Sequence, residues 1–144
     1  MLITGAVGQG KSNLLSVIIH SLCQRYSPRE LELHLLDFKE GISLQPFFNE
    51  ATGQYLPHAR VLGLDADHEF GHNVLARLHQ LYRERMKLFK TAGVQNIREF
   101  RVLYPDHGLP RVVVIIDEFQ MMFTERDRAS DETAGLLVRA VRLF

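Results

Sequence analysis

The sequence predicts an α/β fold with a mostly parallel sheet, and three observations lead to it. Apolar runs typical of strands alternate with amphipathic helical segments along the 144 residues. The run at residues 112–116 is apolar and almost purely β-branched, as expected of a strand covered on both faces of a parallel sheet. A glycine-rich loop opens the first helix. Such alternation favours right-handed crossovers, so we expect one α/β domain over residues 1–144.

The first half of the chain predicts a helix and two short strands. Apolar side chains recur at helical spacing between residues 11 and 26, and this helix should end before Pro28. Its predicted apolar face comprises Leu14, Leu15, Ile18, Ile19 and Leu22. Residues 31–36 and 60–64 predict strands. Residues 41–57, which separate them, are a mixed stretch rich in glycine, proline and phenylalanine.

The second half predicts a long amphipathic helix over residues 69–91. Asp67 is suited to cap its first turn, and the helix should end near Gly93. Its apolar stripe comprises Val74, Leu75, Leu78, Leu81, Tyr82, Leu88 and Phe89. A shorter helix is expected over residues 96–103, followed by the strand at 112–116 and a last helix.

The composition excludes several classes of protein. Seventeen Lys and Arg balance seventeen Asp and Glu, and 46% of the residues are hydrophobic, which excludes a disordered chain. A single cysteine, Cys23, excludes an internal disulfide, and we expect it to be a small buried hydrophobe. No apolar run approaches the roughly 20 residues of a membrane helix, and no signal peptide is recognisable, so a cytoplasmic location is expected.

A phosphate-binding loop is predicted near the N-terminus. Its residues match G-x-x-x-x-G-K-[ST] and are Gly5, Ala6, Val7, Gly8, Gln9, Gly10, Lys11 and Ser12. Glycines allow backbone N–H groups to surround phosphate oxygens, and the helix N-terminus adds the positive end of its dipole. We expect these residues and Asn13 to bind ATP. Lys11 would have a catalytic role at the β- and γ-phosphates, and Ser12 would be a Mg²⁺ ligand.

An acidic pair, Asp117 and Glu118, follows the β-branched run. The carboxyl ends of parallel strands form the edge at which α/β sheets bind ligands. We expect Asp117 to hold Mg²⁺ through water and Glu118 to orient and deprotonate the attacking water. The chain contains no N-K-x-D segment, as in GTPases, and no L-S-G-G-Q segment, as in transport cassettes. The acidic pair therefore favours a Mg²⁺-dependent ATP hydrolase.

Four segments occur in a characteristic order along the chain. They are T-G-A-V-G-Q-G-K-S at 4–12, L-L-D-F-K-E-G at 35–41, E-R-M-K-L-F-K-T-A-G-V-Q-N-I at 84–97 and V-V-I-I-D-E-F at 113–119. Together they resemble the FtsK/SpoIIIE ATPases, ring motors that pump double-stranded DNA and whose relatives drive type VII protein secretion. The resemblance implies a RecA-like P-loop NTPase fold, a three-layer sandwich. Since only four residues precede Gly5 and the chain ends within the helix after Glu118, that fold should be truncated at both ends.

The resemblance also implies how the domain works. The family suggests a homo-hexameric ring with ATP at subunit interfaces and an arginine supplied in trans, for which Arg139 and Arg142 are the candidates. DNA translocation is the expected function. The segment Asp37, Phe38 and Lys39 is closer to the secretion branch, so protein export stays open as an alternative. A nucleotide-binding assembly module without turnover is a third reading, which the presence of Glu118 disfavours.

Two further patterns have competing interpretations. Residues 68–72 match the zinc-protease pattern H-E-x-x-H, but they follow Asp67 at a predicted helix start and include a glycine, which disfavours rigid zinc ligation. Residues 77–101 hold seven Lys and Arg against two Glu. This excess fits either a basic face for DNA or a neighbouring subunit, or a solvated helix face.

Overall fold

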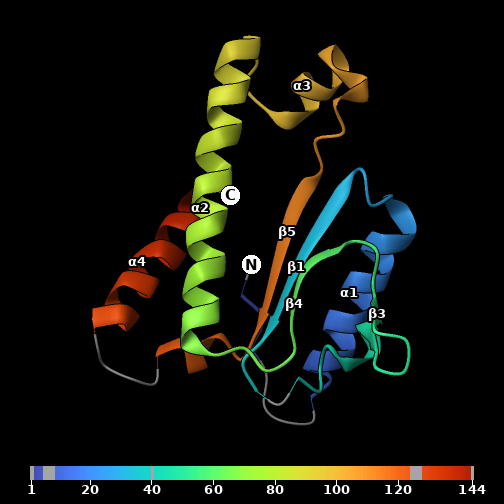
Figure 1. Ribbon diagram of the computed structural model, residues 1–144, viewed down its shortest axis with the longest axis vertical. Helices are drawn as coiled ribbons and strands as arrows, with labels where there is room; N and C mark the ends of the chain where they lie inside the picture. Colours follow the sequence, from blue (N-terminus) through green and yellow to red (C-terminus); the bar gives the residue numbers. More distant parts are fainter. Residues whose placement is uncertain (1, 5–8, 40, 124–127, 144) are drawn as a thin grey trace. The chain divides into compact units, whose positions relative to one another are not determined.

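The computed structural model describes residues 2–4, 9–39, 41–123 and 128–143. The chain forms two compact units, each with its own elements (Figure 1). The first unit comprises Met1–Asp65 and Pro110–Asp117, and the second comprises Ala66–Leu109 and Glu118–Phe144.

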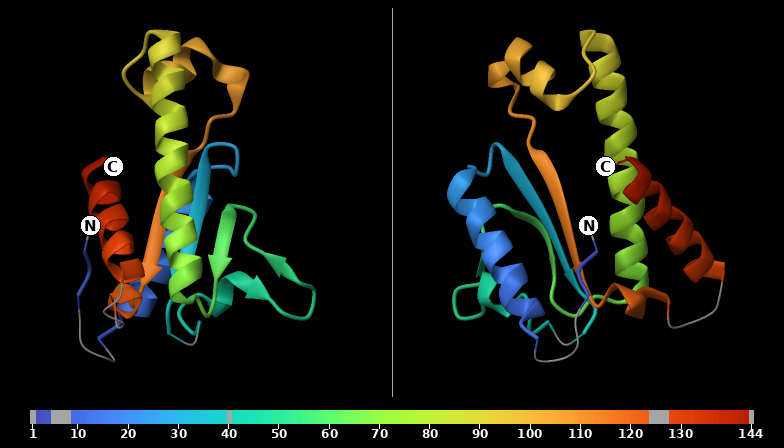
Figure 2. Two further views of the ribbon diagram at one scale, coloured as in Figure 1. Left: turned by 60° about the vertical axis from the view of Figure 1, so that its left-hand side comes forward. Right: turned by 180° about the vertical axis from the view of Figure 1, so that it is seen from behind.

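A parallel sheet and one helix form the first unit. The strands are β1 (Leu31–Asp37), β4 (Ala59–Gly63) and β5 (Arg111–Asp117), in the order β4-β1-β5. Both pairings are parallel, and β1 and β5 pair in register from Leu31 opposite Arg111 to Asp37 opposite Asp117. Helix α1 (Lys11–Arg25) runs alongside the strands (Figure 2). The predicted α/β class with a parallel sheet is confirmed.

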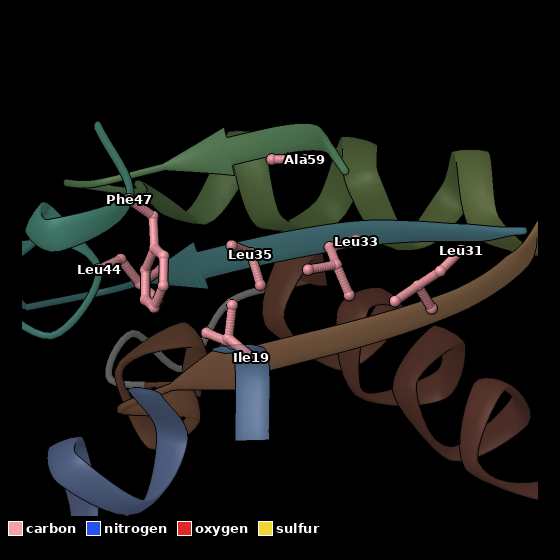
Figure 3. Packing of buried hydrophobic residues seen from close by; sticks show 7 residues of the cluster. All are labelled: Ile19, Leu31, Leu33, Leu35, Leu44, Phe47 and Ala59. Carbon is pink, nitrogen blue, oxygen red and sulfur yellow. The ribbon is translucent and has the colours of Figure 1, made fainter. Parts of the chain in front are cut away.

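The core of this unit lies between α1 and one face of β1. Leu31, Leu33 and Leu35 project from the same side of β1, as the two-residue period of a strand requires (Figure 3). They pack with Ile19 of α1, Leu44, Phe47 and Ala59 of β4. Full burial of such a leucine stabilises the fold by about 1.5–3 kcal/mol relative to exposure. This cluster therefore fixes α1, and with it the start of the helix, against the sheet.

Cys23 packs at the margin of the same cluster, as a partly buried side chain. Burial raises the pKa of its thiol, which favours the neutral form. The expectation of a small hydrophobic cysteine is therefore close to what is found, although the side chain is half-buried rather than fully enclosed.

Two expectations about burial need correction. Leu14 was predicted on the apolar face of the first helix, but it is 46% exposed, while Leu15 and Ile19 carry the contact. Residues 112–116 of β5 are only half-buried. In the part of the chain that the structure describes, β5 pairs with β1 alone, so it is an edge strand and lacks the cover expected of a central one.

The mixed stretch after β1 is structured. It contains a 3-10 turn η1 (Gln45–Phe47) and a small antiparallel hairpin of β2 (Phe48–Asn49) and β3 (Gln54–Tyr55). Leu44 and Phe47 anchor this stretch in the core.

The second unit is helical. It contains α2 (His68–Ala92), α3 (Ile97–Leu103), η2 (Pro105–His107), η3 (Phe119–Phe123) and α4 (Arg128–Leu143). The side chain of Asp67 accepts a hydrogen bond from the Phe70 N–H at 2.7 Å and caps α2, and Gly93 ends it with φ 69°. Helices α2 and α4 lie side by side (Figures 1 and 2). Among the described helices, none combines the length and the apolar character needed to cross a bilayer.

Candidate nucleotide-binding site

Lys11 and Asp117 form an ion pair in the first unit. The Lys11 Nζ atom lies 3.1 Å from Asp117 Oδ1, and the Asp117 side chain is only 5% exposed. Lys11 begins α1, and Asp117 ends β5, so the sheet and its covering helix bring the two motifs together. A carboxylate this deeply buried requires a charged partner or hydrogen bonds. The structure thus unites the two residues that were predicted from separate motifs.

The start of α1 has the geometry of an anion site. Gly10 precedes the helix with φ 80°, in the left-handed region that a residue with a Cβ rarely adopts. The Leu14 N–H donates to the Gly10 carbonyl at 2.9 Å, which is the first helical hydrogen bond. The N–H groups in the first turn of an α-helix point out of its N-terminus, and α1 presents those of Lys11, Ser12 and Asn13 in this way. Gly5, Ala6, Val7 and Gly8 lie outside the described residues.

Ser12 contacts a residue that the motif does not include. Its hydroxyl lies 2.9 Å from the hydroxyl of Ser43, in the turn between β1 and η1. Asn13 and Gln9 are exposed on either side of the helix start. The sequence identified Ser12 but gave no signal for Ser43, because no motif connects the two positions.

A second buried carboxylate lies beside Asp117. Asp37 is 1% exposed at the end of β1 and is paired in register with Asp117 of β5. Its Oδ1 accepts the Lys39 N–H at 2.8 Å, and the Phe38 N–H donates to the Asp117 carbonyl at 3.4 Å. Asp37 was expected only as part of the segment at 35–41 and not as a site residue. The sequence feature that could have identified Asp37 as a site residue is its position at the end of a strand, which Asp117 shares.

The donors at this sheet edge fit Mg²⁺. The Ser12 hydroxyl and the Asp117 carboxylate are hard oxygen ligands of the kind this cation prefers. Asp117 is held at a fixed strand end, and its buried charge is balanced by Lys11. Ser12 and Asp117 are the residues that would hold the ion.

Glu118 begins the second unit, directly after Asp117 in the chain. Its backbone has φ 52°, the left-handed region, which costs a residue with a Cβ about 1–2 kcal/mol. Its carboxylate accepts a hydrogen bond from the Gln120 amide, and its carbonyl accepts the Met121 N–H. Strain of this kind is concentrated at functional positions, which is consistent with a role for Glu118.

The remaining predicted residues lie on helices of the second unit. Arg139 is an exposed residue of α4, and Arg142 is on the same helix with a side chain outside the described set. His68 Nδ1 lies 3.0 Å from the Met122 carbonyl, and His72 Nδ1 lies 2.9 Å from the Thr133 hydroxyl. Both histidines therefore have structural partners that explain their presence without zinc.

Comparison with known proteins gives a consistent result. The model of the FtsK/SpoIIIE family matches residues 1–143. The ESX secretion system protein EccC of Geobacillus thermodenitrificans is 30% identical over 130 residues, which cover 86% of this chain and 8% of that protein. The DNA translocase FtsK of Chlorobaculum tepidum is 26% identical over 147 residues, which cover 99% of this chain and 18% of that protein. The chain thus spans under a fifth of these relatives.

A solved structure shares the fold. The monomer form of TcpA, the pCW3 conjugation coupling protein, with ATPγS has a TM-score of 0.74 and 22% identity. The match covers 96% of this chain and 37% of that one.

Proposed function

Since the chain belongs to the FtsK/SpoIIIE family, we propose that it binds ATP with Mg²⁺ at the start of α1 and hydrolyses it within a motor. The observation that carries this proposal is the ion pair of Lys11 with Asp117, 3.1 Å long. It joins the phosphate-binding lysine to the carboxylate expected to hold the metal, at the edge where parallel sheets bind ligands.

Each residue has a distinct role in the proposed reaction. The N–H groups at the start of α1 bind phosphate oxygens, and Lys11 carries the positive charge toward the β- and γ-phosphates. Ser12 and Asp117 hold the cation, which supplies charge neutralisation to the phosphate oxygens when bound. Glu118 orients the attacking water and accepts its proton at the carboxylate.

Hydrolysis is tested by separating binding from turnover in the full-length protein. Glu118→Gln should keep ATP binding and abolish turnover, since it removes only the proton acceptor. Lys11→Ala should lose binding, and Lys87→Ala, which removes an exposed lysine of α2, should change neither. Turnover equal to wild type in Glu118→Gln would overturn the assignment of the base. ATP binding without turnover in the wild-type ring would instead select the assembly module.

We propose secreted protein, rather than DNA, as the cargo. The sequence alone ranked DNA first, but the ESX secretion proteins among the relatives are 29–30% identical and the DNA translocases 26–29%, and the Asp37-Phe38-Lys39 segment agrees with the secretion proteins. The zero net charge of the chain also provides no overall attraction for a phosphate backbone.

DNA translocation is the second candidate, supported by the relatives named DNA translocases. Duplex DNA distinguishes the two cargoes. If the cargo is protein, turnover should stay unchanged when duplex DNA is added at low salt. Stimulation by DNA that falls steeply as salt increases would favour a DNA motor, because phosphate contacts release counterions.

The proposed assembly is a homo-hexameric ring in the cytoplasm. In such a ring ATP lies at the interface between subunits, and an arginine of one subunit reaches the γ-phosphate bound to its neighbour. Arg139 is the first candidate for this arginine because its side chain is exposed on α4. Arg142 is the second.

A further inference from the structure

We propose that Ser43 is a positioning residue for Ser12, through the hydrogen bond between their hydroxyl groups. The two oxygens lie 2.9 Å apart, and the residues are separated by 31 positions in the sequence. The inference deepens the proposed function and rests on it, because the role of Ser12 as a metal ligand belongs to that proposal.

The chemistry of a hydroxyl ligand explains why Ser12 needs a partner. A serine hydroxyl has one proton and two lone pairs, and it can present a lone pair to a cation only when the proton points elsewhere. Ser43 Oγ lies where it can accept that proton. In this arrangement Ser12 donates to Ser43 and its lone pairs remain available to the metal. Outer partners of this kind orient the ligand before the metal arrives.

The turn that carries Ser43 is fixed from both sides. Gly41 has φ 66°, and a Cβ placed there would lie 2.1 Å from the Leu64 carbonyl oxygen, so only glycine permits this approach to the end of β4. On the other side Leu44 is fully buried in the core. The N–H groups of Leu44 and Gln45 both donate to the Gly41 carbonyl, at 3.2 and 3.0 Å.

The strand before this turn is also anchored. Asp37, buried at the end of β1, accepts the Lys39 N–H at 2.8 Å and so directs the chain as it leaves the sheet. A residue on a surface loop free to move would not hold a hydroxyl in one orientation. Ser43 is instead half-buried between a glycine contact and a core leucine.

The test measures the Mg²⁺-dependent part of nucleotide affinity. A fluorescent ATP analogue is titrated into the full-length protein in Mg²⁺ and in EDTA, with Glu118→Gln in every variant to prevent turnover. Ser43→Ala should weaken affinity in Mg²⁺ about threefold to tenfold, the effect of one lost hydrogen bond, and leave affinity in EDTA unchanged. Ser43→Thr, which keeps the hydroxyl, should restore it. Ser21→Ala, at an exposed serine of α1, is the matched control.

A double variant determines whether Ser43 acts through Ser12. In a Ser12→Ala background, Ser43→Ala should have no further effect on the Mg²⁺-dependent affinity. The parent protein here is Glu118→Gln with no other change. The proposal is overturned if Ser43→Ala binds the analogue in Mg²⁺ as tightly as the parent does, if it weakens binding equally in EDTA, or if its effect persists in the Ser12→Ala background. In those cases the parent still binds nucleotide, and the proposed function stands. A parent that binds no nucleotide contradicts the proposed function itself, and this inference with it.

Discussion

Glu118 has a strained backbone conformation. Among the described residues other than glycine, it alone has a positive φ, at 52°. Glu118→Gly should relieve the strain, whereas Glu118→Val adds a β-branched side chain to a region that such residues avoid. We expect the glycine variant to be more stable than the valine variant by about 1–2 kcal/mol, measured by urea unfolding, and both to lack turnover.

The comparison of these two variants is internally controlled, since both remove the same carboxylate. Equal unfolding free energies would mean that the left-handed conformation is not retained in solution. A glycine variant that still hydrolyses ATP would remove Glu118 from the chemistry, whatever its conformation.

At the level of single residues, the sequence pointed to those candidate-site residues that belong to short motifs. Lys11 and Asp117 were recognisable because a phosphate loop and a strand-end carboxylate each have a local pattern, and the structure brings them to 3.1 Å. Ser43 was not recognisable, because its contact with Ser12 depends on how the chain turns after β1. For Asp37 the sequence indicated the position at the end of a strand. It did not indicate that the side chain is buried or that it lies beside Asp117.

At the level of elements, the turn after β1 can be tested with a matched pair of glycines. Gly41 and Gly53 have nearly equal φ values, 66° and 65°, but a Cβ at Gly41 would meet the Leu64 carbonyl while one at Gly53 would meet nothing within 4 Å. Gly53→Ala should therefore lower the free energy of unfolding only by the cost of a Cβ at positive φ, about 1 kcal/mol. Gly41→Ala should lower it by about 1–3 kcal/mol more, because the backbone must move to admit the methyl group.

Urea unfolding of the two variants measures this difference. Gly41→Ala should also weaken Mg²⁺-dependent nucleotide affinity as Ser43→Ala does, since the displaced turn carries Ser43. Equal stability of the two glycine variants would show that the approach of Gly41 to β4 is not tight.

Helix boundaries were predicted well where capping residues mark them. The expected helix over residues 69–91 is observed as α2 (His68–Ala92), with Asp67 and Gly93 at its ends. Residues 41–57 could not be assigned, because η1, β2 and β3 are two or three residues long and depend on contacts with the core. The exposure of Leu14 was not predictable for a related reason. Periodicity identifies the apolar face of a helix, but not which residues of that face are covered by the sheet.

At the level of the whole molecule, the alternation of strands and helices was sufficient to predict a parallel sheet, but not its strand order. The order β4-β1-β5 makes the β-branched run an edge strand within the described residues, and no local pattern indicates which strands are neighbours. The three-layer RecA-like arrangement and the ring stay predictions. The first concerns how the two units are arranged, and the second concerns how subunits assemble.

The ring itself can be tested by mixing two inactive proteins. If Arg139 acts in trans, Arg139→Ala and Glu118→Gln should each abolish turnover as full-length proteins. In rings mixed at equal amounts, an interface is complete when an Arg139→Ala subunit supplies Glu118 and a Glu118→Gln subunit supplies Arg139. Random assembly gives about a quarter of such interfaces, so turnover should recover to about that fraction of wild type.

Turnover can recover only if Glu118 of one subunit and Arg139 of its neighbour act in the same site. If each site lay within one subunit, every subunit in the mixture would still lack one of the two residues. The matched control is a mixture of Lys11→Ala with Glu118→Gln, which should stay inactive, since both changes affect the same subunit's half of the site. Wild-type turnover in Arg139→Ala alone would exclude Arg139, and the same mixture would then be made with Arg142→Ala. No recovery in either mixture, with rings confirmed to exchange subunits, would contradict ATP hydrolysis at a shared interface.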